Sequence, residues 1–149
     1  MKLDELIAPD PRYSRQDAPN RILMASSLTF LLPMMAALRA NAMYAAAVSG
    51  NLAVTSFLYH MTKDIHYFWV DQAACFLYVV AFVYEVFFKK QFFYQILVAA
   101  ITVYTMTIYH YGYLNQCYIW DSDCSLSSAH HAGMHVVAAL AGAMTFLTE

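Results

Sequence analysis

Residues 67–88 decide the fold, and they read YFWVDQAACFLYVVAFVYEVFF. Apart from Asp71 and Glu85, this stretch carries no residue that is charged at neutral pH. A helix that crosses a bilayer needs about 20 mostly apolar residues, so the stretch predicts a transmembrane helix. A carboxylate inside such a helix is expensive to bury, which makes Asp71 a candidate functional residue by default.

The composition of the whole chain agrees with a membrane location. The chain has 149 residues, of which 61% are hydrophobic and only 12% are charged. Soluble domains carry about 25% charged residues, and a chain of this length is expected to form one domain. A formal net charge of −2 gives no indication of a nucleic-acid partner. We therefore expect a multi-pass integral membrane protein.

The apolar segments predict an all-α bundle of about five transmembrane helices in residues 22–149, after a polar tail at 1–21. Pro33 is expected to kink the first helix, and residues 111–125 are expected to form a loop. Charged residues near the helix ends favour neither orientation strongly, so the sidedness and the identity of the membrane stay open. The expected spans are 22–38, 43–60, 67–88, 92–109 and 126–147.

Five spans bring particular helix ends to one face of the membrane: the end of the second, the start of the third, the end of the fourth and the start of the fifth. All six histidines of the chain lie near these ends. Asp71 and His60 flank the turn between the second and third spans, so they are expected at similar depth. Histidines with only local structural roles would not gather in this way. The histidines are His60, His66, His110, His130, His131 and His135.

The spacing of the polar residues indicates an open zinc site. His131 and His135 are four positions apart and share one helix face. With His60 from another span they supply the three protein ligands of a catalytic zinc ion, which leaves a fourth position for water. Asp71 could hold that water and take its proton. Ser56, one turn from His60, could donate a hydrogen bond to a developing oxyanion.

These residues resemble the signature of the CREST superfamily, which includes alkaline ceramidases, the adiponectin-receptor family and myomaker-type proteins. The match consists of Ser56-x-x-x-His60, Asp71 and His131-x-x-x-His135. The resemblance implies Zn²⁺ bound by the three histidines, Asp71 and Ser56 at the bound water, and hydrolysis of an amide or ester bond in a ceramide-like membrane lipid. Local sequence is most similar to the myomaker-like branch at FLLPMMAALR (30–39), SFLYH (56–60) and WDSDCSLSSAHHAGMH (120–135).

The chain departs from the family pattern in the number of spans, because family members usually have seven and this chain has room for about five. The loss of two spans keeps the last helix in the same orientation, so the zinc site can still close. It removes walls of the substrate cavity, which a homodimer could replace.

Two other interpretations stay open from sequence. The chain could be a non-enzymatic, myomaker-like protein of membrane remodelling or signalling, in which zinc only joins the second and fifth spans. It could also be a bis-histidine haem protein that uses His60, His110 and the fifth-span pair His131 and His135, although Ser56 and Asp71 would then have no role. The sequence equally leaves open whether Cys117 and Cys124 form a disulfide bond.

Overall fold

The structure, a computed structural model, describes residues 19–89 and 92–147, so most of the expected polar tail lies outside the described residues. The expected all-α class is confirmed, because every regular element in the described residues is helical. The elements are α2 (Arg21–Ser27), η2 (Leu28–Phe30), α3 (Leu31–Arg39), α4 (Met43–Thr62), α5 (Ile65–Lys89), α6 (Phe92–Met106), η3 (Thr107–Tyr111), α7 (Gly112–Asn115), η4 (Tyr118–Trp120) and α8 (Cys124–Leu147).

α2, η2 and α3 follow one another without a loop and form one continuous segment, which we call the first rod (Arg21–Arg39). Asn20 caps its start, since the Asn20 side chain accepts a hydrogen bond from the backbone N–H of Leu23 at 3.1 Å. The short 3₁₀ turn η2 ends three residues before Pro33. Proline lacks the N–H that would bond to the carbonyl four residues earlier, which explains a change of helical register at this place.

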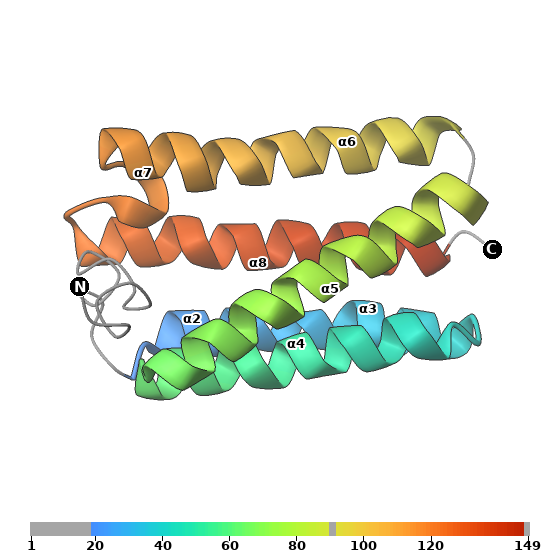
Figure 1. The fold of residues 1–149 in the computed structure, drawn as a ribbon, viewed down its shortest axis with the longest axis horizontal. Helices are drawn as coiled ribbons and strands as arrows, with labels where there is room; N and C mark the ends of the chain where they lie inside the picture. Colours follow the sequence, from blue (N-terminus) through green and yellow to red (C-terminus); the bar gives the residue numbers. More distant parts are fainter. Residues whose placement is uncertain (1–18, 90–91, 148–149) are drawn as a thin grey trace, which may run out of the picture.

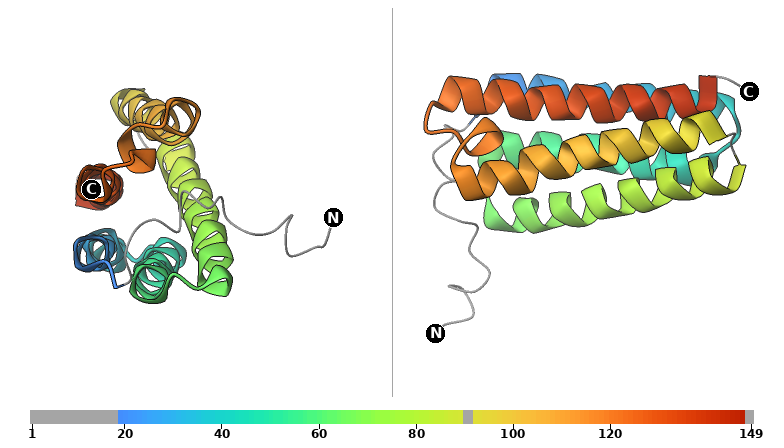
Figure 2. Two further views of the ribbon diagram at one scale, coloured as in Figure 1. Left: turned by 90° about the vertical axis from the view of Figure 1, so that its left-hand side faces the viewer. Right: turned by 90° about the horizontal axis from the view of Figure 1, so that it is seen from above.

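In the part of the chain that the structure describes, five long helical segments run back and forth between two ends of the bundle (Figure 1). The first rod packs against both α4 and α8, and α5 packs against α4. α5 then crosses the bundle diagonally and its far end reaches α6, which also contacts α8 (Figures 1 and 2). The end of α4 and the starts of α2, α5 and α8 therefore lie at the same end of the bundle.

Small residues bring the helices of the core close together. Ala37, Ala45 and Ala139 are completely buried where the first rod, α4 and α8 approach one another. In α8, a Cβ added at Gly142 would collide with the Tyr78 hydroxyl and would stand 3.1 Å from the Cβ of Pro33. Close approach through small residues is the usual packing mode of helices in membranes.

Within residues 19–89 and 92–147, three segments are long and apolar enough to cross a membrane: Arg21–Arg39, Ile65–Phe88 and Phe92–Trp120. They make the chain compatible with a membrane protein. α4 and α8 are long enough to cross but contain more polar residues, so they fall outside this set. The passage of five helices through the bilayer stays a prediction.

The region expected to be a loop, 111–125, consists mainly of short helical turns. The π-helical turn η3 continues α6 into α7, and α8 already begins at Cys124. Trp120 explains why this region is folded into turns, because its ring is buried and its Nε1–H donates to the carbonyl of Tyr109 at 2.9 Å. Cys117 and Cys124 do not form a disulfide bond with each other.

Candidate metal centre

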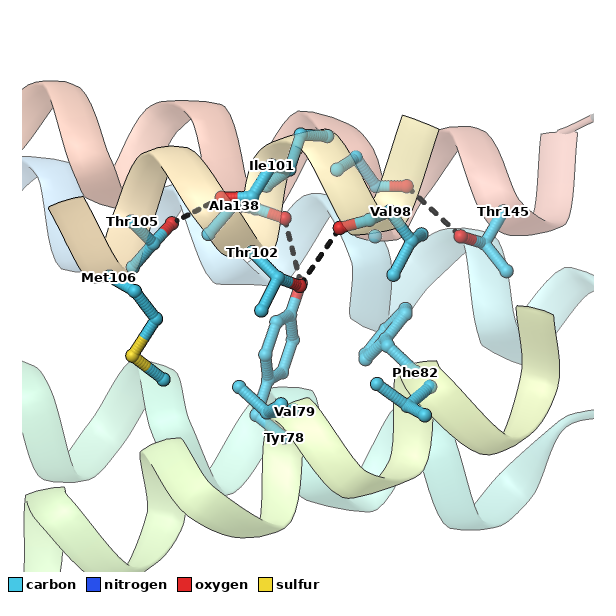
Figure 3. A pocket seen from close by; sticks show the side chains of 13 residues that line it. Tyr78, Val79, Phe82, Val98, Ile101, Thr102, Thr105, Met106, Ala138 and Thr145 are labelled. Atoms are coloured by element: carbon cyan, nitrogen blue, oxygen red, sulfur yellow. Dashed lines mark hydrogen bonds between the residues drawn. The ribbon is translucent and has the colours of Figure 1, made fainter. Parts of the chain in front are cut away.

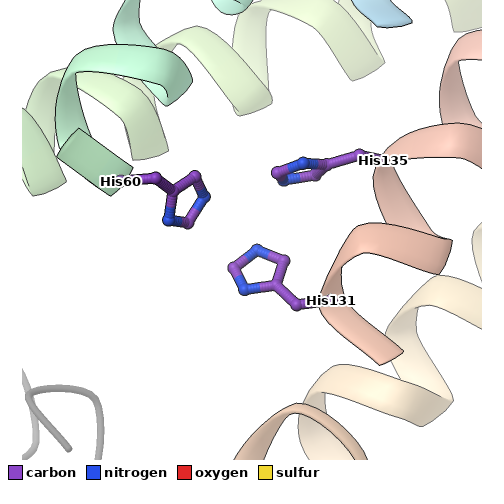
Figure 4. Close-up of side chains that lie close together, drawn as sticks. All are labelled: His60, His131 and His135. Atoms are coloured by element: carbon purple, nitrogen blue, oxygen red, sulfur yellow. The ribbon is translucent and has the colours of Figure 1, made fainter. Parts of the chain in front are cut away.

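Three histidines predicted as metal ligands come together between α4 and α8 (Figure 4). One ring nitrogen from each of His60, His131 and His135 lies within 4.8 Å of the others. The ring centroids are 4.9 Å apart for His60 and His131, 5.4 Å for His60 and His135, and 4.8 Å for His131 and His135. Three imidazoles at such separations could hold one metal ion.

The polar atoms of this cluster fit a cation. His60 has no exposed surface, and its Nε2 is a buried atom without a hydrogen-bond partner in the structure. A buried polar group without a hydrogen-bond partner destabilises the folded state, so such a group calls for an explanation such as a bound ion. His131 and His135 are also buried. An ion bound by all three rings would satisfy the Nε2 of His60.

Hydrogen bonds from the start of the first rod reach both helices that carry the histidines. The backbone N–H of Asn20 donates to the carbonyl of His60 at 3.0 Å, and the Asn20 amide donates to Ser128 Oγ at 2.8 Å. Ser26 Oγ lies 2.9 Å from Nδ1 of His135. The first rod thus connects the end of α4 to the first turns of α8.

Asp71 and Ser56, the predicted catalytic residues, are both buried at the same end of the bundle. Thr55 Oγ1 donates to Oδ1 of Asp71 at 3.4 Å, and the Ser56 hydroxyl also interacts with this carboxyl group. Ser27 Oγ lies 3.0 Å from Oγ of Ser56. Ser56 is therefore placed between the first rod and Asp71, one helical turn from His60.

A lysine that was not among the predicted site residues stands beside the histidines. Lys63 follows the last turn of α4 in a left-handed conformation with φ 55°. Its Nζ lies 3.4 Å from Nδ1 of His60 and 4.8 Å from the centre of the Tyr59 ring. Burial lowers the pKa of Lys63 to about 8, and the nearby Asp71 carboxylate opposes this shift. Asp71 therefore faces a basic group from the α4–α5 connection.

An apolar crevice of about 120 Å³ lies between α5, α6 and α8 (Figure 3). Tyr78 and Ala138 belong to its lining, and the Tyr78 hydroxyl donates to the Ala138 carbonyl at 3.0 Å. Ala138 follows His135 by one turn, which places this part of the crevice about 5 Å further along α8. The hydroxyls of Thr102 and Thr105 donate hydrogen bonds to carbonyls of their own helix, so the crevice offers few polar groups to a ligand.

The other histidines do not join the cluster. His66 and His110 are exposed, and His130 is half-buried with its ring 5.3 Å from that of Tyr118. The haem alternative drew on His110, which lies outside the group of possible metal ligands.

Sequence reasoning missed three residues that touch the site: Asn20, which caps the first rod, and Ser26 and Ser27 within the rod. A signal was present, because two adjacent serines interrupt an apolar stretch at 26–27 and polar residues in a span are functional candidates.

Comparison with protein-family models, with curated proteins and with solved structures finds no match to this chain.

Proposed function

We propose that this chain is a zinc-dependent hydrolase of the membrane that cleaves an amide or ester bond in a lipid, as a shortened member of the CREST superfamily. The observation that carries the proposal is the buried cluster of His60, His131 and His135, with ligand atoms within 4.8 Å of one another. Catalytic zinc sites commonly use three protein ligands and keep one position open. Asp71 and Ser56, buried at the same end of the bundle, supply the further groups that hydrolysis needs.

Each residue has a separate part in this chemistry. A zinc ion held by the three imidazoles would act as a Lewis acid and lower the pKa of a bound water from about 15.7 to about 7. Asp71 takes the proton of the attacking water, and Ser56 donates a hydrogen bond to the carbonyl oxygen of the substrate as that oxygen becomes negative. The C–N or C–O bond then breaks, and the proton passes from Asp71 to the leaving amine or alcohol.

The apolar crevice supports the lipid part of the proposal. It begins about one helical turn from His135 and is lined almost entirely by apolar groups of α5, α6 and α8. A hydrocarbon chain is the ligand whose surface such a lining matches, since no buried polar group would be left unpaired.

A second candidate is a non-enzymatic membrane protein in which zinc joins α4 to α8. The small size of the crevice favours it, because about 120 Å³ lies below the roughly 300–1,000 Å³ of ordinary ligand pockets. In this case the metal would stabilise the bundle without any turnover. The enzymatic proposal includes a homodimer, in which the second copy of the chain would supply the missing walls of the substrate cavity.

The test is a joint measurement of metal content and hydrolysis in detergent-purified protein. Wild type is expected to hold about one zinc per chain and to release fatty acid from a short-chain fluorescent ceramide or a phospholipid ester. His131→Ala is expected to lose both properties. Asp71→Asn is expected to keep its zinc and to lose about 10²- to 10⁴-fold in rate, the usual contribution of a general base.

Each contrary result separates the candidates. Hydrolysis that persists in His131→Ala would refute the role of the metal. Intact zinc in wild type, with no fatty acid released from either lipid, would replace the hydrolase by the structural candidate. Wild type without zinc would exclude both.

A further inference from the structure

Ser26 of α2 touches one of the candidate metal ligands from a helix that carries none of them. It is only 7% exposed, and its Oγ makes two contacts. One is with Nδ1 of His135 at 2.9 Å, and the other is with the carbonyl of Leu23 at 3.0 Å. We propose that Ser26 is a positioning residue of the metal centre, which holds the His135 ring so that Nε2 is presented to the ion. The inference rests on the metal site of the proposed function.

The proton count of the serine hydroxyl sets the direction of these bonds. A hydroxyl group has one hydrogen to donate, and it can accept through its lone pairs. Since the Leu23 carbonyl can only accept, it takes the hydrogen of Ser26. The contact with His135 is then satisfied when Nδ1 carries a hydrogen and donates it to Ser26 Oγ. In that neutral tautomer Nε2 has a free lone pair, which is the form that binds a metal.

A second contact restricts the same ring from another side. The ring of Phe30 packs against that of His135 with centroids 5.5 Å apart and planes inclined by 58°. Phe30 lies in η2, one helical turn after Ser26 on the first rod. The first rod thus supplies both a hydrogen bond and a packing surface to His135. Groups that orient a metal-bound histidine in this way typically change metal affinity by about 10- to 100-fold when they are removed.

The experiment measures zinc affinity by competition with a chromophoric chelator in detergent-purified full-length protein. Ser26→Ala is expected to bind zinc about 10- to 100-fold more weakly than wild type. The matched control is Ser49→Ala, which removes another fully buried serine whose hydroxyl bonds to the Ala45 carbonyl of its own helix. Ser49→Ala is expected to keep wild-type affinity, and Ser26→Thr, which retains the hydroxyl, is expected to recover most of the loss.

A spectroscopic readout separates positioning from a general loss of structure. The visible absorption of the Co²⁺-substituted protein is expected to change in Ser26→Ala and to stay unchanged in Ser49→Ala. If Ser26→Ala does not fold, Ser26→Cys keeps the size of the side chain with a weaker hydrogen-bonding group, and it is expected to show an intermediate loss of affinity.

The outcomes distinguish this inference from the proposed function. Zinc affinity in a folded Ser26 variant within about threefold of wild type, with an unchanged Co²⁺ spectrum, would overturn the role of Ser26 and leave the hydrolase proposal intact. A wild-type protein that binds no zinc would overturn both. Loss of hydrolysis in Ser26→Ala with full zinc affinity would also count against a role in holding the metal ligand.

Discussion

The segment that begins with α6 is more apolar than its neighbour α8, but α8 is the more deeply buried of the two. The segment Phe92–Trp120, which begins with α6, is apolar enough to cross a membrane, yet only 6% of its most apolar window is buried inside the protein. α8 does not reach the same hydropathy, but it carries His131 and His135 and contributes Ala139 to the core. The most apolar surface therefore lies outside, and the polar groups lie inside.

This difference has a simple physical cause. An exposed side chain of a membrane helix meets lipid, where any polar group is expensive. A side chain that faces neighbouring helices can be polar if it finds a partner there, as His135 does at Ser26. Hydropathy thus selects the first rod, α5 and the segment that begins with α6, and it passes over α4 and α8, the two helices that hold the candidate metal ligands.

The strongest test of the comparison removes one ligand from α4. His60→Ala is expected to abolish the stabilisation by zinc, which amounts to about 4 kcal/mol when the metal is present at about 1,000 times its dissociation constant. The measurement is thermal unfolding with and without zinc. His110→Ala is the control, because that histidine is exposed on η3 and its loss is expected to change nothing. Equal responses of the two variants to zinc would remove His60 from the site.

An effect of comparable or smaller size is expected from shortening apolar side chains inside and outside the bundle. Leu52 of α4 is 2% exposed and Ile96 of α6 is 53% exposed. Leu52→Ala leaves a cavity and is expected to cost about 2–5 kcal/mol, whereas Ile96→Ala is expected to cost less than about 0.5 kcal/mol, as at most surface positions. Denaturation in detergent measures both. Similar losses would mean that α6 packs against protein on its exposed side.

The smallest of the three effects compares two glycines of α8. Gly142→Ala drives a Cβ into the Tyr78 hydroxyl, so it is expected to break the Tyr78–Ala138 hydrogen bond and to cost about 1–3 kcal/mol. Among the described residues, a Cβ added at Gly133 would have no neighbour within 4 Å other than its own stretch of helix. Gly133→Ala is expected to stabilise the helix by up to about 1 kcal/mol. If the same denaturation measurement gave Gly142→Ala the higher stability, the close contact of α5 and α8 would be excluded.

The cluster of three histidines could be predicted from sequence because such residues are uncommon in apolar helices. Two histidines spaced by four on one helix, and another histidine close to Asp71 at the start of a candidate span, have few alternative explanations. The residues around them could not be predicted in the same way. Ser26 and Asn20 are common residue types, and their importance depends on which helices meet, which the periodicity of one helix does not reveal.

The helical class was equally accessible, since long apolar segments leave few other structures in a membrane. The region 111–125 was not, because its polar residues suggested a loop while Trp120 and Ile119 pack inward as parts of short turns. The diagonal course of α5 also follows from packing between helices. Alanines and glycines on α8 decide how closely α5 can approach. Mean hydropathy does not show which of these small residues face α5.

The π-helical turn Thr107–Tyr111 has a consequence for the rotation of the helix that contains it. A π turn is equivalent to one residue inserted into an α-helix, in which each residue advances the rotation by about 100°. The crevice wall at Thr102 and Thr105 precedes the turn, and the Tyr109 carbonyl that holds Trp120 lies within it. Deletion of one residue here would turn that wall away from α5 by more than a quarter of a revolution, with hydrophobicity and length almost unchanged. The one extra residue of the π turn thus determines how the two ends of this helix are rotated relative to each other about its axis.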